Sequence, residues 1–89
     1  MLYANYPNPF NPETRITYQL PERGDVRLEI YNTLGQKVRT LVRGMQETGT
    51  HTVAWDGRDE AGQTAASGVY LYQLQAGKYR QTRKMVLMK

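Results

Sequence analysis

The sequence predicts an all-β protein, an antiparallel β-sandwich of about seven strands. Apolar and polar residues alternate in several short segments, which is the period of a strand with one buried face. Glycine, proline, asparagine and aspartate separate these segments at the intervals that all-β domains show. No segment of useful length has the apolar spacing of a helix. The 89 residues form a single domain, 1–89, and a domain of this size has only marginal stability.

The first segment, residues 1–14, is expected to be an extended arm, and residues 15–89 are expected to form the sandwich. Prolines alternate with asparagine in YPNPFNPET. Each proline lacks a backbone donor and pushes the preceding residue toward extended geometry, which excludes a helix and disfavours a central strand. We expect Tyr6 and Phe10 of this arm to dock onto the body of the domain.

The strands follow in order, each with apolar residues at alternate positions or with strongly β-prone residues. We expect strands at 15–20, 26–30, 36–43, 50–55, 69–74 and 79–88. The turns between them combine proline, glycine, asparagine and aspartate at 21–25, 32–35, 44–49, 56–68 and 76–78. Alternation further predicts that Tyr70, Tyr72 and Leu74 face the core.

Trp55 allows two interpretations. It is in phase with His51 and Val53 on one face of its strand, which favours burial at the strand end with a partner for the indole N–H. The alternative is an exposed platform for stacking on a carbohydrate. His51 is the only histidine, and it lacks the companions that a catalytic triad or a zinc site needs. We therefore expect it to be a surface strand residue.

The segment WDGRDEAG is interpreted as a structural turn motif. Its characteristic residues are Trp55, Asp56, Gly57, Asp59 and Gly62. Alternatively, Asp56, Asp59 and Glu60 could form a calcium site. The spacing of a calcium-binding EF-hand loop is absent, however. The favoured interpretation is that Asp56 accepts backbone N–H bonds and that Gly57 adopts a positive φ.

No constellation of catalytic residues is present, so we expect no enzyme and no catalytic, metal or cofactor site. The eight acids fall mostly on turns and on outward strand positions, whereas a glycosidase needs paired carboxylates in a cleft. No glycine-rich loop precedes a helix to bind phosphate. The absence of cysteine is compatible with the cytosol and with export.

Neither a transmembrane segment nor a signal peptide is expected. No stretch is apolar over the roughly 20 residues that a bilayer requires, and MLYANYPNPF lacks a charged region followed by an apolar run. If the domain is exported, a signal upstream must direct it.

The net charge of +4 is concentrated at the end of the chain. Five basic residues and no acid lie between Gly77 and Lys89. Such a segment favours an edge strand that Lys and Arg keep soluble. Alternatively, it is a basic address that a receptor recognises, or it binds an acidic partner. We expect no nucleic-acid partner, because exposed aromatic residues are not interleaved with these charges.

Five motifs together resemble a known family. They are YPNPFNPETRITYQLP, VRLEIYNTLGQKVRTL, HTVAWDGRDEAG, SGVYLYQL and the terminal RKMVLMK. The chain resembles the C-terminal sorting domain (type A) of the bacterial type IX secretion system over nearly its whole length. Its middle is also similar to the immunoglobulin-like domain of the flagellar hook-capping family. The fold implied is an immunoglobulin-like antiparallel β-sandwich of about seven strands. Ala65 and Ala66 depart from the pattern, in which a larger β-branched residue is frequent.

The resemblance implies a non-catalytic address. An N-terminal passenger would reach the periplasm with its own signal, and an outer-membrane secretion translocon would recognise the sandwich and carry the passenger out to the medium or the cell surface. A surface transpeptidase would then remove the domain and attach the passenger to anionic lipopolysaccharide. The implied recognition residues are Gly68, Gly77, Arg83, Lys84, Met85, Val86, Leu87, Met88 and Lys89.

Strand pairing is the physical route that suits such an address, because an edge strand offers unpaired donors and acceptors to another sheet. Two alternatives remain. One is a carbohydrate-binding or other accessory sandwich of a multidomain secreted enzyme, which requires exposed aromatic residues in a row. The other is a structural assembly module like the flagellar hook cap.

Overall fold

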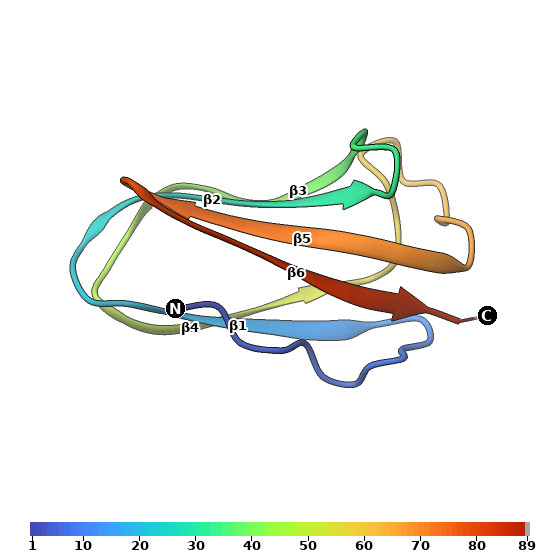
Figure 1. Cartoon of the computed structure of the whole chain (residues 1–89), viewed down its shortest axis with the longest axis horizontal. Helices are drawn as coiled ribbons and strands as arrows, with labels where there is room; N and C mark the ends of the chain where they lie inside the picture. Colours follow the sequence, from blue (N-terminus) through green and yellow to red (C-terminus); the bar gives the residue numbers. More distant parts are fainter. Residues whose placement is uncertain (89) are drawn as a thin grey trace.

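The chain folds into two facing β-sheets (Figure 1). The structure is a computed structural model that describes residues 1–88. Its strands are β1 (Thr14–Leu20), β2 (Gly24–Asn32), β3 (Lys37–Gln46), β4 (Gly49–Trp55), β5 (Gly68–Ala76) and β6 (Tyr79–Leu87). The all-β sandwich is therefore confirmed, with six strands in the described residues where about seven were expected.

One sheet has two strands in the order β1-β4, and the other has four in the order β3-β2-β5-β6. Every pairing between named strands is antiparallel. Tight turns join β2 to β3 and β5 to β6, whereas the chain changes sheets between β1 and β2, between β3 and β4, and between β4 and β5. These crossings between sheets produce a sandwich rather than one flat sheet.

The core lies between the sheets and is built by the predicted alternation. Ile16, Tyr18 and Leu20 of β1 contribute one apolar row, Tyr70, Tyr72 and Leu74 of β5 contribute a second, and β2 contributes a third. The buried apolar residues are Leu2, Phe10, Ile16, Tyr18, Leu20, Val26, Leu28, Ile30, Trp55, Ala65, Tyr70, Tyr72, Leu74, Met85 and Leu87.

Trp55 is fully buried, so the core interpretation is confirmed and the stacking platform is wrong for this residue. Its ring centroid lies 5.7 Å from that of Phe10 and 5.5 Å from that of Tyr70. The contact with Tyr70 is edge-to-face, a geometry that aromatic quadrupoles favour. His51 is half-buried, since its ring stacks on Tyr18 with centroids 5.2 Å apart.

The N-terminal arm serves both sheets. Its first part pairs with the outer edge of β1, through bridges from Leu2 to Tyr18 and from Tyr6 to Arg15. It then crosses to the other sheet, where Phe10 forms a parallel bridge with Leu87 of β6. The arm thus takes the place of a seventh strand. It ends one residue earlier than expected, because β1 begins at Thr14.

The two aromatic residues of the arm behave differently. Phe10 is buried, as predicted, but the expectation for Tyr6 is wrong, because its side chain is 80% exposed. The backbone of Tyr6 does bind the body, donating to and accepting from Arg15 at 3.0 and 2.9 Å. Its neighbour Asn5 is buried, so alternation turns the Tyr6 side chain toward solvent.

The buried Tyr72 holds the arm by its hydroxyl group. The Tyr72 hydroxyl accepts the Asn5 N–H at 2.9 Å and donates to the Tyr3 carbonyl at 2.8 Å. Burial raises the pKa of Tyr72, because the apolar interior disfavours the phenolate. One side chain of β5 therefore ties the arm to the four-stranded sheet from the inside.

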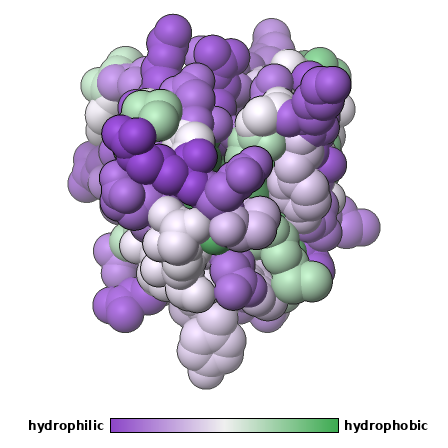
Figure 2. Space-filling view, turned by 90° about the vertical axis from the view of Figure 1, so that its left-hand side faces the viewer, coloured by the Kyte–Doolittle hydropathy of each residue, from purple (hydrophilic) through white to green (hydrophobic). Residues whose placement is uncertain are grey.

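At the end where β1 turns into β2 and β5 into β6, the surface is mainly hydrophilic around small apolar patches (Figure 2). A cavity of about 430 Å³ opens between these turns, lined by Leu20, Val26, Ala76 and Tyr79 among others. Residues 1–88 contain no helix of the length and apolarity that a bilayer crossing requires.

Replacing Trp55 with alanine should lower the free energy of unfolding by about 3–5 kcal/mol, because the change opens a cavity beside Phe10 and Tyr70. Chemical denaturation followed by circular dichroism measures this loss. Tyr6→Ala is the matched control, since an exposed aromatic ring should cost less than about 0.5 kcal/mol. Equal losses in the two variants would contradict the placement of Trp55 at the centre of the core.

Candidate functional site

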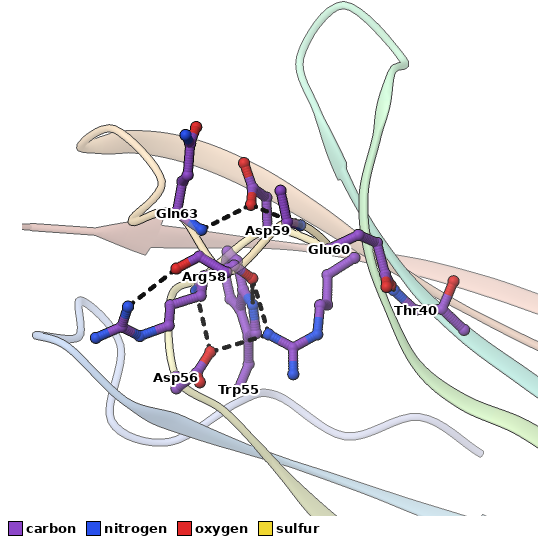
Figure 3. Close-up of polar contacts among 10 residues, drawn as sticks. Thr40, Trp55, Asp56, Arg58, Asp59, Glu60 and Gln63 are labelled. Atoms are coloured by element: carbon purple, nitrogen blue, oxygen red, sulfur yellow. Dashed lines mark hydrogen bonds and ion pairs between the residues drawn. The ribbon is translucent and has the colours of Figure 1, made fainter.

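The loop between β4 and β5 is organised by two aspartates (Figure 3). Asp56 Oδ1 accepts the backbone N–H of Arg58 at 3.0 Å, which is the Asx turn predicted from Asp-Gly. Asp59 Oδ1 accepts the N–H groups of Ala61 and Gln63 at 3.0 and 2.9 Å. The aspartates therefore replace the ladder bonds that an irregular segment lacks.

The carbonyl of Arg58 joins this loop to both sheets. It accepts the indole N–H of Trp55 at 2.9 Å and a guanidinium N–H of Arg39 at 3.0 Å. The same Arg39 nitrogen lies 3.1 Å from Asp56 Oδ1. Trp55 closes β4 and Arg39 belongs to β3, so a single carbonyl oxygen fixes the loop against one strand of each sheet (Figure 3).

Glu60 extends the contact with β3. Its backbone N–H donates to the Val38 carbonyl at 3.0 Å, and its carboxylate accepts the Thr40 N–H. The loop thus covers the outer edge of β3 over these residues. The sequence did not reveal Arg39 or Thr40 as partners of the loop, because the pairing depends on how the two sheets face each other.

The carboxylates of the loop point to backbone donors and to Arg39 rather than toward one another. In residues 1–88, no three histidine, cysteine, aspartate or glutamate side chains converge in the way that metal binding requires. The turn interpretation of WDGRDEAG is confirmed by these hydrogen bonds, and Gly57 and Gly62 have the positive φ values of 77° and 86°.

Gly57 is restricted by space as well as by φ. A Cβ at this position would lie 3.0 Å from the Pro12 carbonyl oxygen and would also touch Leu87. The loop, the arm and the terminal strand therefore meet at Gly57. No residue with a side chain fits there without displacing the arm.

The terminal strand β6 divides into two halves. Met85 and Leu87 are buried in the core, and Val86 is half-buried on the opposite face. Arg83, Lys84 and Met88 are exposed. A partner that meets the folded domain therefore reaches the basic side chains and Met88 of this predicted address, but not Met85 or Leu87. Lys89 lies outside the described residues.

The two predicted glycines frame the hairpin that contains β6. Gly77 lies in the turn between β5 and β6 with a φ of 60°, which favours glycine over any residue with a Cβ. Gly68 begins β5 and pairs with Leu87 at the other end of the ladder. Both support the hairpin geometry, and neither brings a functional group to the surface.

Among residues 1–88, the outer edge of β6 is covered only at its C-terminal end. Phe10 N–H donates to the Val86 carbonyl at 3.0 Å, Met88 N–H donates to the Phe10 carbonyl at 2.9 Å, and Asn8 Oδ1 accepts the Val86 N–H at 3.0 Å. The part of the predicted address that should offer a free border is thus occupied by the arm. The sequence contained a signal for this in the β-breaking Asn-Pro pattern, which suits a capping segment.

Earlier in β6 the edge is open. The outward bonds of Val86 show that its backbone groups face away from β5, and an antiparallel ladder repeats this orientation at every second residue. Lys84, Thr82 and Arg80 therefore present N–H and C=O groups outward. Within residues 1–88 no hydrogen bond reaches these groups. The side chains of Gln81 and Arg83 bind the Leu2 backbone instead.

Glu29 is the central acid on the outward face of the four-stranded sheet. Its burial acts to raise its pKa, but the hydrogen bonds from Tyr31 and Lys37 and the charges of Lys37 and Arg27 outweigh it. The pKa of Glu29 is consequently lowered from its ordinary value of 4.5. The Tyr31 hydroxyl donates at 2.7 Å, and this bond raises the pKa of Tyr31.

Two stacked sheets with an arm between their edges define an immunoglobulin-like β-sandwich domain. The chain belongs to the FlgD Ig-like domain family, whose model matches residues 7–80. A search of curated proteins gave no match.

Several solved structures are similar to this chain, and PorZ, FlgD and PorU are three of them. PorZ, described as an essential bacterial surface component of the type IX secretion system of Porphyromonas gingivalis, has a TM-score of 0.67 and 25% identity over 99% of this chain and 11% of PorZ. FlgD of P. aeruginosa has a TM-score of 0.65 and 24% identity over 83% of this chain and 58% of FlgD. Dimeric latent PorU of Porphyromonas gingivalis has a TM-score of 0.76 and 18% identity over 98% of this chain and 9% of PorU. This chain spans a small part of PorZ and PorU, and FlgD and PorU share its fold alone.

Gly57→Ala should destabilise the domain by roughly 2–3 kcal/mol, because strain at positive φ adds to the clash with the Pro12 carbonyl. Gly62→Ala is the matched control. It has a similar φ of 86° and open space around the added Cβ, so it should cost about 1 kcal/mol. Denaturation midpoints of both variants measure the difference. Equal costs would show that the meeting of loop, arm and terminal strand is not tightly packed.

The lowered pKa of Glu29 predicts acid sensitivity. A group whose pKa is lower in the folded state stabilises fully above its unfolded value of 4.5, and this stabilisation is lost as the pH falls through the folded value. Glu29→Gln should therefore lose less free energy of unfolding than the wild type between neutral pH and about pH 3. Urea denaturation at both pH values measures the difference.

Glu22→Gln removes a carboxylate from an exposed turn and serves as the control for the acid experiment. It should behave like the wild type. A Glu29→Gln variant that matches the wild type at both ends of the pH range would argue against the stabilising bonds from Tyr31 and Lys37.

Proposed function

We propose that this domain is a non-catalytic C-terminal sorting module of a secreted passenger protein. An outer-membrane translocon of the type IX kind would recognise the folded sandwich and deliver the passenger, through the periplasm, to the medium or the cell surface. A surface transpeptidase would act on the junction between passenger and domain. The observation that carries the proposal is the unpaired basic edge of β6 between Arg80 and Lys84.

The open edge has what strand addition requires. Arg80, Thr82 and Lys84 each offer an outward N–H and C=O, and their exposed side chains alternate with those of Gln81 and Arg83. A partner strand can bond to this backbone and obtain specificity from the alternate side chains. The basic side chains disfavour pairing of this edge with a hydrophobic edge strand of another molecule, and this protects the free domain from aggregation.

This docking segment differs in position from the one implied by resemblance. The implied segment ran from Arg83 to the end of the chain, whereas the arm already pairs with Val86 and Met88. Recognition of the folded domain is therefore proposed for residues 80–84. Met85 and Leu87 contribute by anchoring the strand in the core.

The similarity to PorZ supports a secretion context. It extends over 99% of this chain at 25% identity, and PorZ is described as a surface component of a type IX secretion system. The arm, the loop between β4 and β5 and the terminal strand all fall within the matched length.

The carbohydrate-binding alternative loses its proposed platform. Trp55, Tyr70 and Tyr72 are at most 7% exposed, whereas Tyr79 of β6 is 42% exposed. A structural assembly module remains the second candidate, because the chain belongs to the FlgD Ig-like domain family. Export of a passenger distinguishes an address from a purely structural module.

The decisive experiment fuses residues 1–89 to a periplasmic reporter in a host that carries the secretion system. The fusion should deliver the reporter to the cell surface or the medium. Thr82→Pro should abolish most of this delivery, because proline removes an outward N–H of the open edge and leaves the bonds to β5 in place.

Thr82→Ala is the matched control, since it loses the same side-chain bond from Gln73 but keeps the backbone N–H. Both purified variants should show similar circular dichroism and denaturation midpoints. Export by Thr82→Pro at the level of Thr82→Ala would exclude docking at this edge. Retention of the unmodified fusion in the periplasm would exclude the sorting function itself.

A further inference from the structure

The strand register places three arginines in one row across the outward face of the four-stranded sheet. Arg43 of β3 pairs with Arg27 of β2, and Arg27 lies opposite Gln75 of β5, which pairs with Arg80 of β6. Their neighbours along the strands face the core, so these four side chains face solvent. Adjacent strands are about 5 Å apart, so the row spans about 15 Å.

A second row lies two steps nearer the C-terminal end of β6. It contains Lys37, Tyr31, Leu71 and Lys84 on the same four strands. Lys84 is about 13 Å from Arg80 along β6, by the rise of a strand. Cations therefore occupy both rows and both outer strands of the sheet.

Most of these cations are not neutralised. Glu29 and Asp25 are the acids that β2 directs to this face, and Glu29 already binds Lys37 and Tyr31. Within residues 1–88, no carboxylate lies within ion-pair distance of Arg27, Arg43, Arg80 or Lys84. The face therefore carries a positive field that is available to a partner.

The opposite face of the sandwich is different. The outward positions of β1 and β4 hold threonine, glutamine and alanine, and Arg15 is the single charged residue among them. The positive charge is therefore one-sided. It would orient the whole domain toward an anionic surface.

Apolar side chains lie beside the second row. Val69 and Val86 are cross-strand partners on the same outward face, next to Leu71 and Lys84. Val69 is 38% exposed, and Met88, directly after β6, is 54% exposed. Cations next to exposed apolar side chains are the combination by which peripheral proteins bind a bilayer interface.

We propose that the outward face of the β3-β2-β5-β6 sheet docks on an anionic lipid surface. The guanidinium groups of the arginine row bind lipid phosphates, for which their fork geometry is suited. Val69 and Met88 enter the interface between the headgroups. The broad sheet face matches a partner that presents many anionic groups in a plane.

A nucleic acid fits this face less well. Binding of single strands uses exposed aromatic platforms between the cations. The one aromatic residue of these two rows, Tyr31, is half-buried, and its hydroxyl is bound to Glu29.

Sedimentation of the purified 89-residue chain with lipid vesicles tests the proposal. Vesicles of phosphatidylcholine with phosphatidylglycerol should bind the domain, and vesicles of phosphatidylcholine alone should not. Each cation near an anionic surface contributes about five-fold in affinity. The variant R27Q/R43Q/R80Q should therefore bind about 100-fold more weakly, and binding by the wild type should weaken as salt is raised.

The matched control is R15Q/R23Q/K78Q, which removes the same charge from other parts of the surface. It should retain most of the binding. Equal loss in both triple variants would overturn the proposal, because net charge alone would then explain the affinity. Absence of binding to anionic vesicles would also overturn it.

A second variant separates lipid from other polyanions. Val69→Ser should weaken binding to anionic vesicles and leave any binding to double-stranded DNA unchanged. Tighter binding to the DNA than to the vesicles, with no effect of Val69→Ser on either, would exclude the lipid surface as the partner. These measurements involve no secretion apparatus, so they succeed or fail independently of the sorting function.

Discussion

The structure depends above all on the path of the N-terminal arm. A two-stranded sheet is too narrow to cover a four-stranded one, and the open side lies between β1 and β6. The arm fills this side by pairing first with β1 and then with β6. It delivers Leu2 and Phe10 to the core while its backbone pairs with the outer edge of β1 and with the C-terminal end of β6. Proline suits this role, because a segment that bridges two edges needs extended geometry and few donors.

On the opposite side, one carbonyl oxygen has a comparable role. The Arg58 oxygen receives bonds from Trp55 and Arg39, so the packing of the largest core residue is coupled to the conformation of a surface loop. Gly57 then connects this loop to the arm, through the Pro12 carbonyl, and to Leu87. The two ends of the chain and the central loop thus belong to one packed unit. This coupling explains why motifs so far apart in the sequence occur together in one small domain.

Local patterns predicted the fold class, most strand positions and the inward residues of β1, β2 and β5. Alternation is a property of each strand alone, so it can be read before any pairing is known. Strand ends were harder: β3 continues to Gln46, because Gly44 keeps its place in the ladder opposite Val26. The turn at Asp56 was also predictable, since an Asx turn involves only neighbouring residues.

Features that depend on the assembly of sheets were not predictable in this way. The sequence showed a basic last strand, but the coverage of its end by Asn8 and Phe10 follows from the crossing of the arm. The row formed by Arg43, Arg27 and Arg80 joins three strands whose order in the sheet is not encoded locally. The exposure of Tyr6 is also not predictable locally: an aromatic residue in an arm is expected to anchor the arm by its side chain, whereas here the backbone of Tyr6 does so.

The direction of the arm also determines where a preceding polypeptide would be attached to the domain. Met1 pairs with Gln19 near the turn between β1 and β2, whereas β6 ends near the other end of a body 37 Å long (Figure 1). Any polypeptide that precedes Met1 therefore departs from the pole remote from Met88. A bulky domain attached there would not cover the residues around Met88. In the proposed sorting function, a passenger that preceded Met1 would leave Met88 uncovered, whereas the docking segment 80–84 lies beside Leu2 and therefore close to the junction with the passenger.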